Sequence, residues 1–232
     1  MPAKTPVVFA WSGGKDSAYG LRVLLGQPQY EVRALLTTLT VETNRVSMSR
    51  IPERLLDRQA RSLGLPLIKV RLPRSCTDQV YEERMIVALR REEFAGVRHV
   101  AFGDLYLEGV RAYREQRLAR VGMRAIFPLW GRDTAILARE MIADGFGAIA
   151  VSVDPRVVAP GFAGRSFDDG FLADLPASVD PCGENGEFHT FVWRAPHFSE
   201  PVGWRTVSVR ADTDGFVYCD LESAPAIQAD PA

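Results

Sequence analysis

The feature that most constrains this chain is a glycine-rich turn near its N-terminus, Ser12-Gly13-Gly14-Lys15-Asp16-Ser17. An apolar run at residues 6–10 directly precedes the turn and predicts a buried strand, and a helical pattern at residues 16–26 follows. Two glycines let the backbone come close to an anion, and the free N–H groups at the start of a helix point toward it. The helix dipole and the charge of Lys15 add to the attraction. This turn, called the phosphate loop below, therefore predicts phosphate binding.

The phosphate loop differs from a Walker A loop. A Walker A loop has a glycine five residues before its Gly-Lys pair and Ser or Thr directly after the lysine. Phe9 and Asp16 occupy these two positions here. The alternative interpretation is an ordinary strand-to-helix turn in which Ser12 and Asp16 cap the helix. Capping accounts for one Ser or Asp but not for the Gly-Gly-Lys between them, so we expect phosphate binding.

Strands and helices alternate through the first half of the chain. Further strands are predicted at residues 31–38, 66–72 and 99–103, and helices at residues 52–63 and 77–95. This alternation is typical of an α/β fold with a doubly wound parallel sheet. Ligands of such folds bind at the carboxyl ends of the strands.

The pattern changes after residue 128. A helix at residues 133–143 and a strand at 148–153 are followed by a loop-rich stretch at 155–187 and by short alternating runs at 190–194, 205–210 and 216–220. These runs predict antiparallel strands. We therefore expect a domain at residues 1–128 that carries the phosphate loop, a smaller α+β domain at 129–222, and a loose tail at 223–232.

Composition excludes several classes of function. The formal net charge is −1, so no global field attracts nucleic acid or an acidic membrane. No apolar stretch approaches the ~18 residues of a membrane span. The cysteines, Cys76, Cys182 and Cys219, form no CxxC pair that would suggest zinc or a disulfide framework. We expect a cytoplasmic protein without membrane or nucleic-acid partners. Arginine far outnumbers lysine, a bias typical of GC-rich coding sequences, which suggests a bacterial source.

Further segments carry a resemblance to a known family. They are Val46-Ser47-Met48-Ser49-Arg50-Ile51-Pro52, Phe102-Gly103-Asp104-Leu105, Tyr113-Arg114-Glu115-Gln116-Arg117-Leu118, Phe127-Pro128-Leu129-Trp130 and Asp180-Pro181-Cys182-Gly183-Glu184-Asn185-Gly186-Glu187-Phe188-His189-Thr190. Together with the phosphate loop they resemble the diphthine–ammonia ligases, a family of PP-loop ATP pyrophosphatases in the adenine nucleotide alpha hydrolase (HUP) superfamily. The resemblance covers most of the chain.

The resemblance implies an activity and its partners. Members of this family adenylate the carboxylate of diphthine, release pyrophosphate and AMP, and form an amide with ammonia. It implies ATP and Mg²⁺ as cofactors. The acceptor would be a carboxylate-bearing small molecule or a modified protein residue, and the nitrogen donor ammonia or an amine. We leave open whether the protein forms a homo-oligomer.

The resemblance also implies roles for individual residues. The phosphate loop would hold the phosphates, with Lys15 acting in catalysis, and Thr37 and Thr38 would lie near the nucleoside. Gly103 and Asp104 would lie beside the reacting phosphate. The acceptor side would be formed by Glu184, Asn185, Gly186 and Glu187. From their own chemistry we add His189 as a catalytic candidate and Arg114 and Arg117 as substrate-binding candidates.

The acidic residues and the histidine have suitable chemistry. Asp104 could bind Mg²⁺, which takes one or two carboxylates plus phosphate oxygens; the alternative is a turn-capping aspartate. Glu184 and Glu187 bracket a turn and could orient an amine or take its proton, or they could lie on a solvated hairpin. His189 could act as an acid or base beside Glu187, or be an ordinary hydrogen-bonded strand residue.

Arg114 and Arg117 share one face of a predicted helix. They could grip a carboxylate or phosphate, or be solvated. Two positions depart from the family pattern, because Ser49 stands where a histidine is usual and His189 where an acidic residue is commoner. These departures leave the acceptor open. The alternative functions are a tRNA-modifying PP-loop enzyme and a nucleotide sensor without catalysis.

Overall fold

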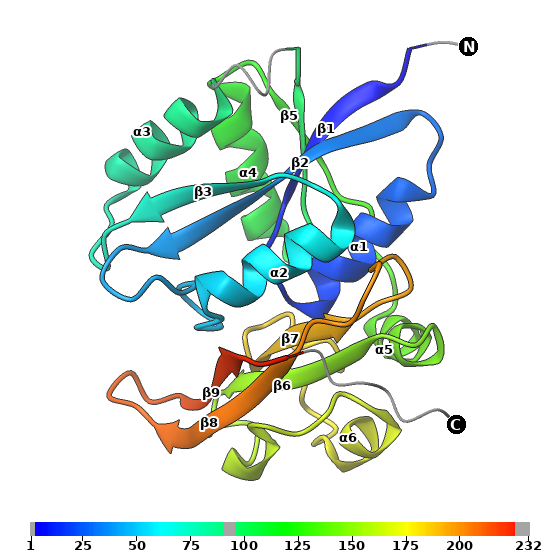
Figure 1. Ribbon diagram of the computed structural model, residues 1–232, viewed down its shortest axis with the longest axis vertical. Helices are drawn as coiled ribbons and strands as arrows, with labels where there is room; N and C mark the ends of the chain where they lie inside the picture. The colour runs from blue at the N-terminus through cyan, green and yellow to red at the C-terminus, as the bar shows by residue number, and fades with distance from the viewer. Residues whose placement is uncertain (1–2, 91–95, 226–232) are drawn as a thin grey trace.

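The computed structural model describes residues 3–90 and 96–225. In the view of Figure 1 a parallel sheet lies above an antiparallel one. The parallel sheet has the strand order β3-β2-β1-β4-β5. Its strands are β1 (Thr5–Ala10), β2 (Tyr30–Thr40), β3 (Leu67–Leu72), β4 (His99–Ala101) and β5 (Arg124–Ile126). The order reverses between β1 and β4, which makes the carboxyl ends of these two strands the expected ligand site.

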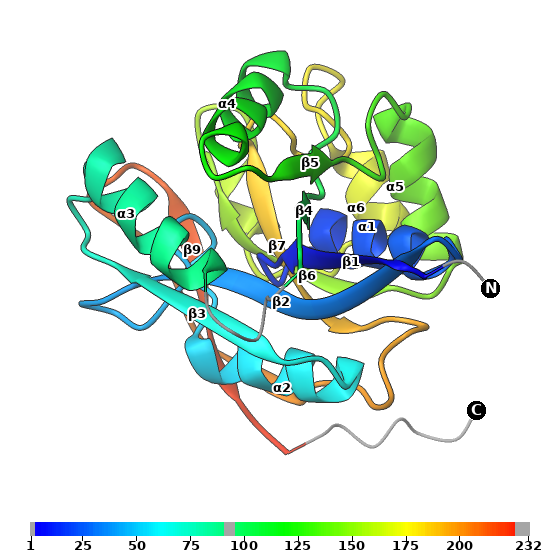
Figure 2. The same ribbon diagram turned by 90° about the horizontal axis from the view of Figure 1, so that it is seen from above.

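Helices cover both faces of the parallel sheet (Figure 2). They are α1 (Lys15–Leu25), α2 (Glu53–Leu63), α3 (Asp78–Leu89) and α4 (Glu108–Ala119). Successive residues of β1 point to opposite faces, so Val7 and Phe9 join the core with α1 and α2, whereas Val8 joins the core with α3 and α4. Both cores are apolar, and this explains why the central strands are continuous apolar runs.

The second sheet is antiparallel, with the order β7-β6-β9-β8. Its elements are α5 (Thr134–Ala143), β6 (Gly147–Val153), a 3₁₀ turn (Pro160–Phe162), α6 (Asp169–Asp174), β7 (Phe188–Arg194), β8 (Trp204–Ala211) and β9 (Val217–Ser223). Every residue of β6 is buried. Residues of β6, β7 and β9 share one continuous core with α1 and α2, so the second sheet packs directly on the first unit.

The expected fold class is confirmed, as a doubly wound α/β sheet with a smaller antiparallel-sheet domain. Four local predictions differ. The strand expected at 99–103 ends at Ala101. The helix expected at 77–95 is described only to Leu89, and residues 91–95 lie outside the described part. The strand β5 was not expected, and the stretch 155–187 contains α6.

Short elements account for two of these differences. The strand β5 has three residues, which is too few to display an alternating pattern. The helix α6 has six residues and depends on a cap, because the Asp168 carboxylate accepts a hydrogen bond from the Phe171 N–H at 2.8 Å. Among the helices of the described residues, none combines the length and apolar character needed to cross a membrane. The domain limits at 128 and 222 stay predictions, although β9 reaches Ser223.

Candidate nucleotide-binding site

A cavity of about 260 Å³ opens where the strand order reverses. The carboxyl ends of β1, β2 and β4 form its walls, and α3, α4 and the loop before β7 complete it. It is lined by Ala10, Trp11, Ser12, Asp16, Ser17, Leu36, Thr37, Thr38, Val46, Tyr81, Met85, Val100, Phe102, Gly103, Asp104, Arg114 and Glu184. This space, called the first cavity below, brings together residues from five of the six segments that carry the family resemblance.

The phosphate loop forms one end of the first cavity. Its hydroxyls are linked, since Ser12 donates to the Ser17 hydroxyl at 3.0 Å and Ser17 donates to the Gly14 carbonyl at 2.9 Å. Gly13 has a φ of +79°, a left-handed conformation that favours glycine. A Cβ at Gly13 would approach Cδ2 of Leu56 to 2.7 Å. The loop therefore needs glycine here for both conformation and space.

Gly103 allows β4 to end against the start of α1. A Cβ at this position would lie 2.8 Å from the backbone atoms of Asp16 and Ser17. Side chains larger than hydrogen would push the phosphate loop away from its present place, because the clash is with backbone and not with a flexible side chain. Gly103 thus shapes the cavity without contributing a polar group.

Thr37 presents an unsatisfied hydroxyl to this space. Its side chain is buried, and its Oγ1 has no hydrogen-bond partner in the described structure. Leaving such a group unpaired costs ~1–3 kcal/mol, so a buried orphan in a cavity wall is a plausible contact for a ligand. Its neighbour Thr38 lines the same wall. Both residues were expected near the nucleoside.

Lys15 points away from the first cavity. Its Nζ donates to the Asp16 carboxylate at 2.9 and 3.0 Å and to the carbonyl oxygen of Cys182, and it lies 5.4 and 5.2 Å from the ring centres of Phe167 and Phe188. Burial pulls the pKa of Lys15 down, but the charge and hydrogen bond of Asp16, together with Cys182 and Asp180, outweigh it and leave the pKa above its ordinary value. The ammonium ion is therefore kept, although phosphate contact would require the side chain to turn.

Asp104 and Arg114 meet at the wall of the first cavity. The Arg114 guanidinium donates to both carboxylate oxygens of Asp104, with Nη2 at 3.0 Å from Oδ1. It also lies 4.4 Å from the ring centre of Phe102. Arg117 takes a different direction, because it pairs with Asp78 at 3.1 Å and with Glu82 beside a separate apolar groove. The shared helix face expected for the two arginines therefore does not bring Arg117 to the cavity.

The two glutamates of the loop before β7 diverge. Glu184 lines the first cavity, and its Oε1 accepts a hydrogen bond from the Leu105 N–H at 2.8 Å. Burial raises the pKa of Glu184, although this hydrogen bond opposes the rise. Glu187 instead turns into its own loop, where Oε1 accepts from the Asp180 N–H at 3.1 Å and from the Asn185 side chain at 2.9 Å. The expectation that both carboxylates face one cleft is met only by Glu184, and Gly186 forms the turn between them with a φ of +86°.

His189 lies on β7 behind the cavity wall and does not line the cavity. Burial, followed by the nearby charge of Lys15, lowers the pKa of His189 to about 4. Its Nε2 has no partner in the described structure. The ring is neutral at neutral pH, which does not suit the acid or base role expected for His189. Burial likewise raises the pKa of Cys182, so this thiol is a poor nucleophile.

Gln59 is the residue whose importance the sequence did not reveal. It is fully buried on α2, and its Nε2 donates to the carbonyls of Gly13 at 2.9 Å and Val192 at 2.6 Å. Its Oε1 accepts from the Trp11 indole at 2.9 Å. Gln59 thereby fastens the phosphate loop to β7. The available signal was a polar residue among Leu55, Leu56 and Ala60 on an apolar helix face.

The cavity fits a nucleotide better than a free metal ion. In the described residues no group of three or more His, Cys, Asp or Glu side chains could hold a metal. Mg²⁺ binds with one or two carboxylates and completes its shell with phosphate oxygens and water. Asp104 is therefore compatible with Mg²⁺ only together with a bound phosphate.

Comparisons with known proteins agree with this geometry. The chain matches the family models described as the diphthamide synthase N-terminal domain over residues 5–125 and the diphthamide synthase C-terminal domain over residues 133–221. The first match covers the parallel sheet as far as β5, and the second runs from α5 into β9.

Curated relatives point the same way. A diphthine–ammonia ligase of Danio rerio is 27% identical over 218 residues, which cover 84% of this chain and 85% of the relative. That of Rattus norvegicus is 26% identical, and that of Homo sapiens 25%, each over 217 residues covering 82% of this chain and 79% of the relative. These matches reach across both sheets. The chain belongs to the diphthamide synthase family.

Proposed function

We propose that this protein is an AMP-forming carbon–nitrogen ligase. In the first step an acceptor carboxylate attacks the α-phosphorus of ATP, which forms an acyl adenylate and releases pyrophosphate. In the second step ammonia or an amine attacks the acyl carbon, which forms an amide and releases AMP. The observation that carries the proposal is the first cavity, where a phosphate loop meets the carboxyl ends of β2 and β4.

The nucleotide side of the reaction rests on three features of the first cavity. The phosphate loop at the start of α1 would bind the β- and γ-phosphates through backbone N–H groups. Gly103 lets the phosphate loop lie directly against the end of β4, because a Cβ at this position would be 2.8 Å from the backbone of Asp16 and Ser17. The unpaired Thr37 hydroxyl would bind a polar atom of the nucleoside. Lys15 would contribute its charge from behind the loop.

Asp104 is the residue we assign to Mg²⁺. A magnesium ion would neutralise phosphate charge during the displacement. Arg114, which now holds the Asp104 carboxylate, would keep that carboxylate oriented and supply a second positive charge at the cavity wall. Both residues would act on charge that develops on the phosphates.

The acceptor side would be served by the loop before β7. Ammonia must lose a proton to form the amide, and Glu184 is the carboxylate of this loop that faces the cavity. Its raised pKa is suited to a general base. Glu187, Asn185, Gly186 and His189 would hold the loop in shape, since Glu187 bonds the loop internally.

Phosphorus NMR tests this proposal. The protein would be incubated with ATP, Mg²⁺, ammonium and a panel of carboxylate metabolites, and the products followed over time. AMP and pyrophosphate formed in a carboxylate-dependent manner would support it. ADP and phosphate as the main products would contradict the assignment, and ATP binding without turnover would favour the sensor alternative. A Gly14→Val variant serves as the control, because blocking the loop should abolish the reaction.

A further inference from the structure

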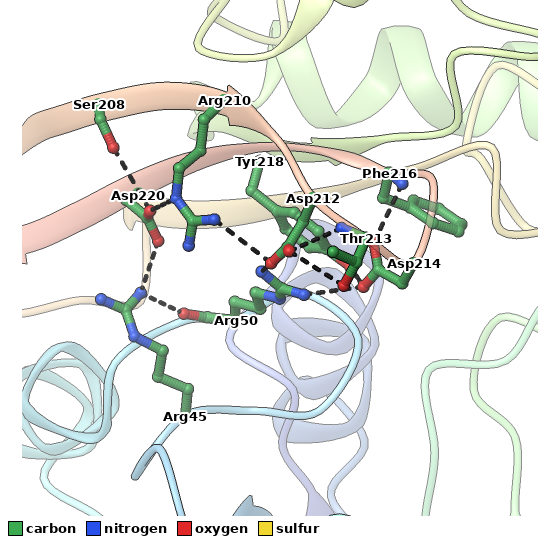
Figure 3. Close-up of polar contacts among 10 residues, drawn as sticks. All are labelled: Arg45, Arg50, Ser208, Arg210, Asp212, Thr213, Asp214, Phe216, Tyr218 and Asp220. Carbon is green, nitrogen blue, oxygen red and sulfur yellow. Dashed lines mark hydrogen bonds and ion pairs between the residues drawn. The ribbon is translucent and has the colours of Figure 1, made fainter.

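A second cavity of about 510 Å³ lies beside the first one. It opens between the loop 41–52 that follows β2 and the hairpin of β8 and β9, two segments far apart in sequence (Figure 3). It is lined by Thr40, Thr43, Arg45, Val46, Ser47, Arg50, Arg74, Arg210, Asp212, Thr213, Asp214 and Asp220. Val46 lines both cavities. The resemblance segment at residues 46–52 contributes Val46, Ser47 and Arg50 to this cavity, but the proposed chemistry gives the cavity no role.

Ion pairs hold the two walls of the second cavity together (Figure 3). Arg50 pairs with Asp212 and, at 2.8 Å, with Asp214, and its guanidinium lies 3.6 Å from the ring centre of Tyr218. Its backbone has a φ of +56°, which is unfavourable for a residue other than glycine. The Arg45 guanidinium donates to the Arg50 carbonyl at 2.9 Å. Such strain persists only where the surroundings hold it, and it gathers at ligand-binding sites.

The charges of the second cavity do not balance. Four arginines line it, against three aspartates. Arg45 and Arg210 both reach Asp220, at 3.2 and 3.0 Å, and Arg50 takes the other two aspartates. Arg74 forms no ion pair with a residue of the described structure, although its backbone N–H donates to the Glu42 carboxylate at 3.0 and 3.2 Å. Hydrogen bonds from the backbone N–H groups of Glu42 and Arg74, together with the Arg74 charge, lower the pKa of Glu42. One guanidinium is therefore available in a wall whose other charges are already paired.

We infer that the second cavity is the acceptor pocket and that it selects an acceptor with two carboxylates. This inference rests on the proposed function. The reacting carboxylate must lie at the nucleotide in the first cavity, so the anion bound by Arg74 has to be a second, unreactive carboxylate. Arginine suits this task because its planar guanidinium binds a carboxylate through two parallel hydrogen bonds.

Position and size support a small molecule as the occupant. The pocket lies at the carboxyl ends of β2 and β3, the edge at which α/β sheets bind ligands. Its volume falls within the ~300–1,000 Å³ of small-molecule sites. Val46 lines both cavities, so the two spaces lie next to one another.

Calorimetric titration with glutarate tests the inference at an ionic strength held constant with chloride. Wild-type protein is expected to bind glutarate, and Arg74→Gln to weaken binding roughly tenfold or more, because a charge-assisted hydrogen bond is lost. Arg74 is exposed, so the variant is expected to fold. Arg33→Gln is the matched control, since Arg33 is an exposed arginine outside both cavities that pairs with Glu31, and its glutarate affinity should equal the wild-type value.

Two comparison probes define the chemistry. Butyrate, with one carboxylate, should bind more weakly than glutarate, and inorganic phosphate should not match glutarate. Equal glutarate affinity in wild type and Arg74→Gln, absence of glutarate binding, or phosphate binding as tight as glutarate would overturn the inference. Binding of a modified protein residue, in place of glutarate, in the second cavity would also overturn the inference.

The failures of the two proposals are distinguishable. ATP affinity should be unchanged in Arg74→Gln, because Arg74 lies outside the first cavity. AMP formation with a carboxylate, together with Arg74-independent glutarate binding, would refute the acceptor pocket alone. Arg74-dependent glutarate binding without AMP formation under any condition would refute the proposed function and, with it, the acceptor role of the pocket.

Discussion

The side-chain amide of Gln59 lies 2.9 Å from the carbonyl oxygen of Gly13, a contact from the second helix to the phosphate loop. The same amide reaches the carbonyl of Val192 on β7 at 2.6 Å. The loop is held further by the Val192 N–H, which donates to the Gly13 carbonyl at 3.0 Å, and by Thr190, whose hydroxyl accepts from the Lys15 N–H at 3.1 Å. The geometry of the phosphate loop therefore depends on both sheets.

Replacing Gln59 by methionine should destabilise the protein and weaken ATP binding. The substitution keeps the length of the side chain but leaves the Trp11 indole N–H without its partner and removes the donor to two buried carbonyls. Unpaired buried polar groups cost ~1–3 kcal/mol. Urea unfolding measures the stability, and Gln29→Met, at an exposed glutamine, should change it by less than ~0.5 kcal/mol. Equal stability of the Gln59 variant and the wild type would contradict the idea that Gln59 holds the phosphate loop to β7.

Gly103→Ala should weaken ATP binding by roughly tenfold or more, on the scale of a few kcal/mol expected when backbone must shift. The new Cβ would lie 2.8 Å from the backbone of Asp16 and Ser17. Gly109→Ala is the control, because Gly109 lies in α4 with no atom near its Cβ position. That change should stabilise the helix slightly. Calorimetry with ATP would decide, and an unchanged affinity in Gly103→Ala would place the phosphates elsewhere.

Thr37→Val separates ligand binding from folding. Valine has nearly the same shape, and it removes a buried hydroxyl that has no partner within the described structure. The free protein should be as stable as the wild type or more stable, whereas ATP should bind several-fold more weakly because a hydrogen bond worth ~0.5–1.5 kcal/mol is lost. Thr190→Val provides the contrast, since this hydroxyl already accepts from Lys15. Loss of stability in Thr37→Val without loss of affinity would contradict the assignment.

Glu184→Gln should lower turnover ~10²–10⁴-fold, the usual contribution of a general base, and leave ATP affinity nearly unchanged. Glu187→Gln should act mainly on stability, because its carboxylate bonds its own loop. Pyrophosphate release with the best acceptor would be measured for both variants. A greater loss of turnover in Glu187→Gln than in Glu184→Gln would indicate that Glu187, and not Glu184, is the general base.

Stability should fall as the pH drops from about 7 toward 4, in part because of His189. Its pKa is lowered to about 4 in the folded protein, below the ordinary value of 6.5. In that window the unfolded chain binds a proton that the folded protein does not. The free energy of unfolding therefore falls as the pH falls, by up to about 2 kcal/mol at pH 5. His189→Gln should make the dependence shallower. His197 has a shift of the same sign and remains in both proteins. An NMR-measured pKa near 6.5 for His189 would contradict this prediction and favour the acid or base role expected from the sequence.

Much of the fold could be predicted because its signals are local. The apolar run of β1, the glycines of the phosphate loop and the helical period of α2 lie in contiguous stretches, and the cavity follows from where parallel strands end. The side-chain directions could not be predicted in the same way. Lys15 points toward Phe167 and Phe188, which approach it only when the second sheet packs. Glu187 turns inward because its own loop folds around it and places the Asp180 N–H at its carboxylate.

The second cavity escaped prediction for a related reason. Its arginines and aspartates come from residues 45–74 and 210–220, which no periodicity connects. In the sequence all of them except Arg50, which lies in the resemblance segment 46–52, look like ordinary surface charges. Only the approach of the β8–β9 hairpin to the loop after β2 turns them into a pocket wall.

The hydrogen bonds between β7 and the phosphate loop have a thermodynamic consequence. A fragment ending at residue 128 would keep every residue of the loop but lose the Val192 and Thr190 contacts that shape it. Nucleotide binding and the local unfolding of the C-terminal half are therefore thermodynamically linked. A ligand that binds the loop only in this shape must also suppress the opening of the second sheet, although it does not contact that sheet. Slower amide hydrogen exchange along β7 would be the sign of that linkage.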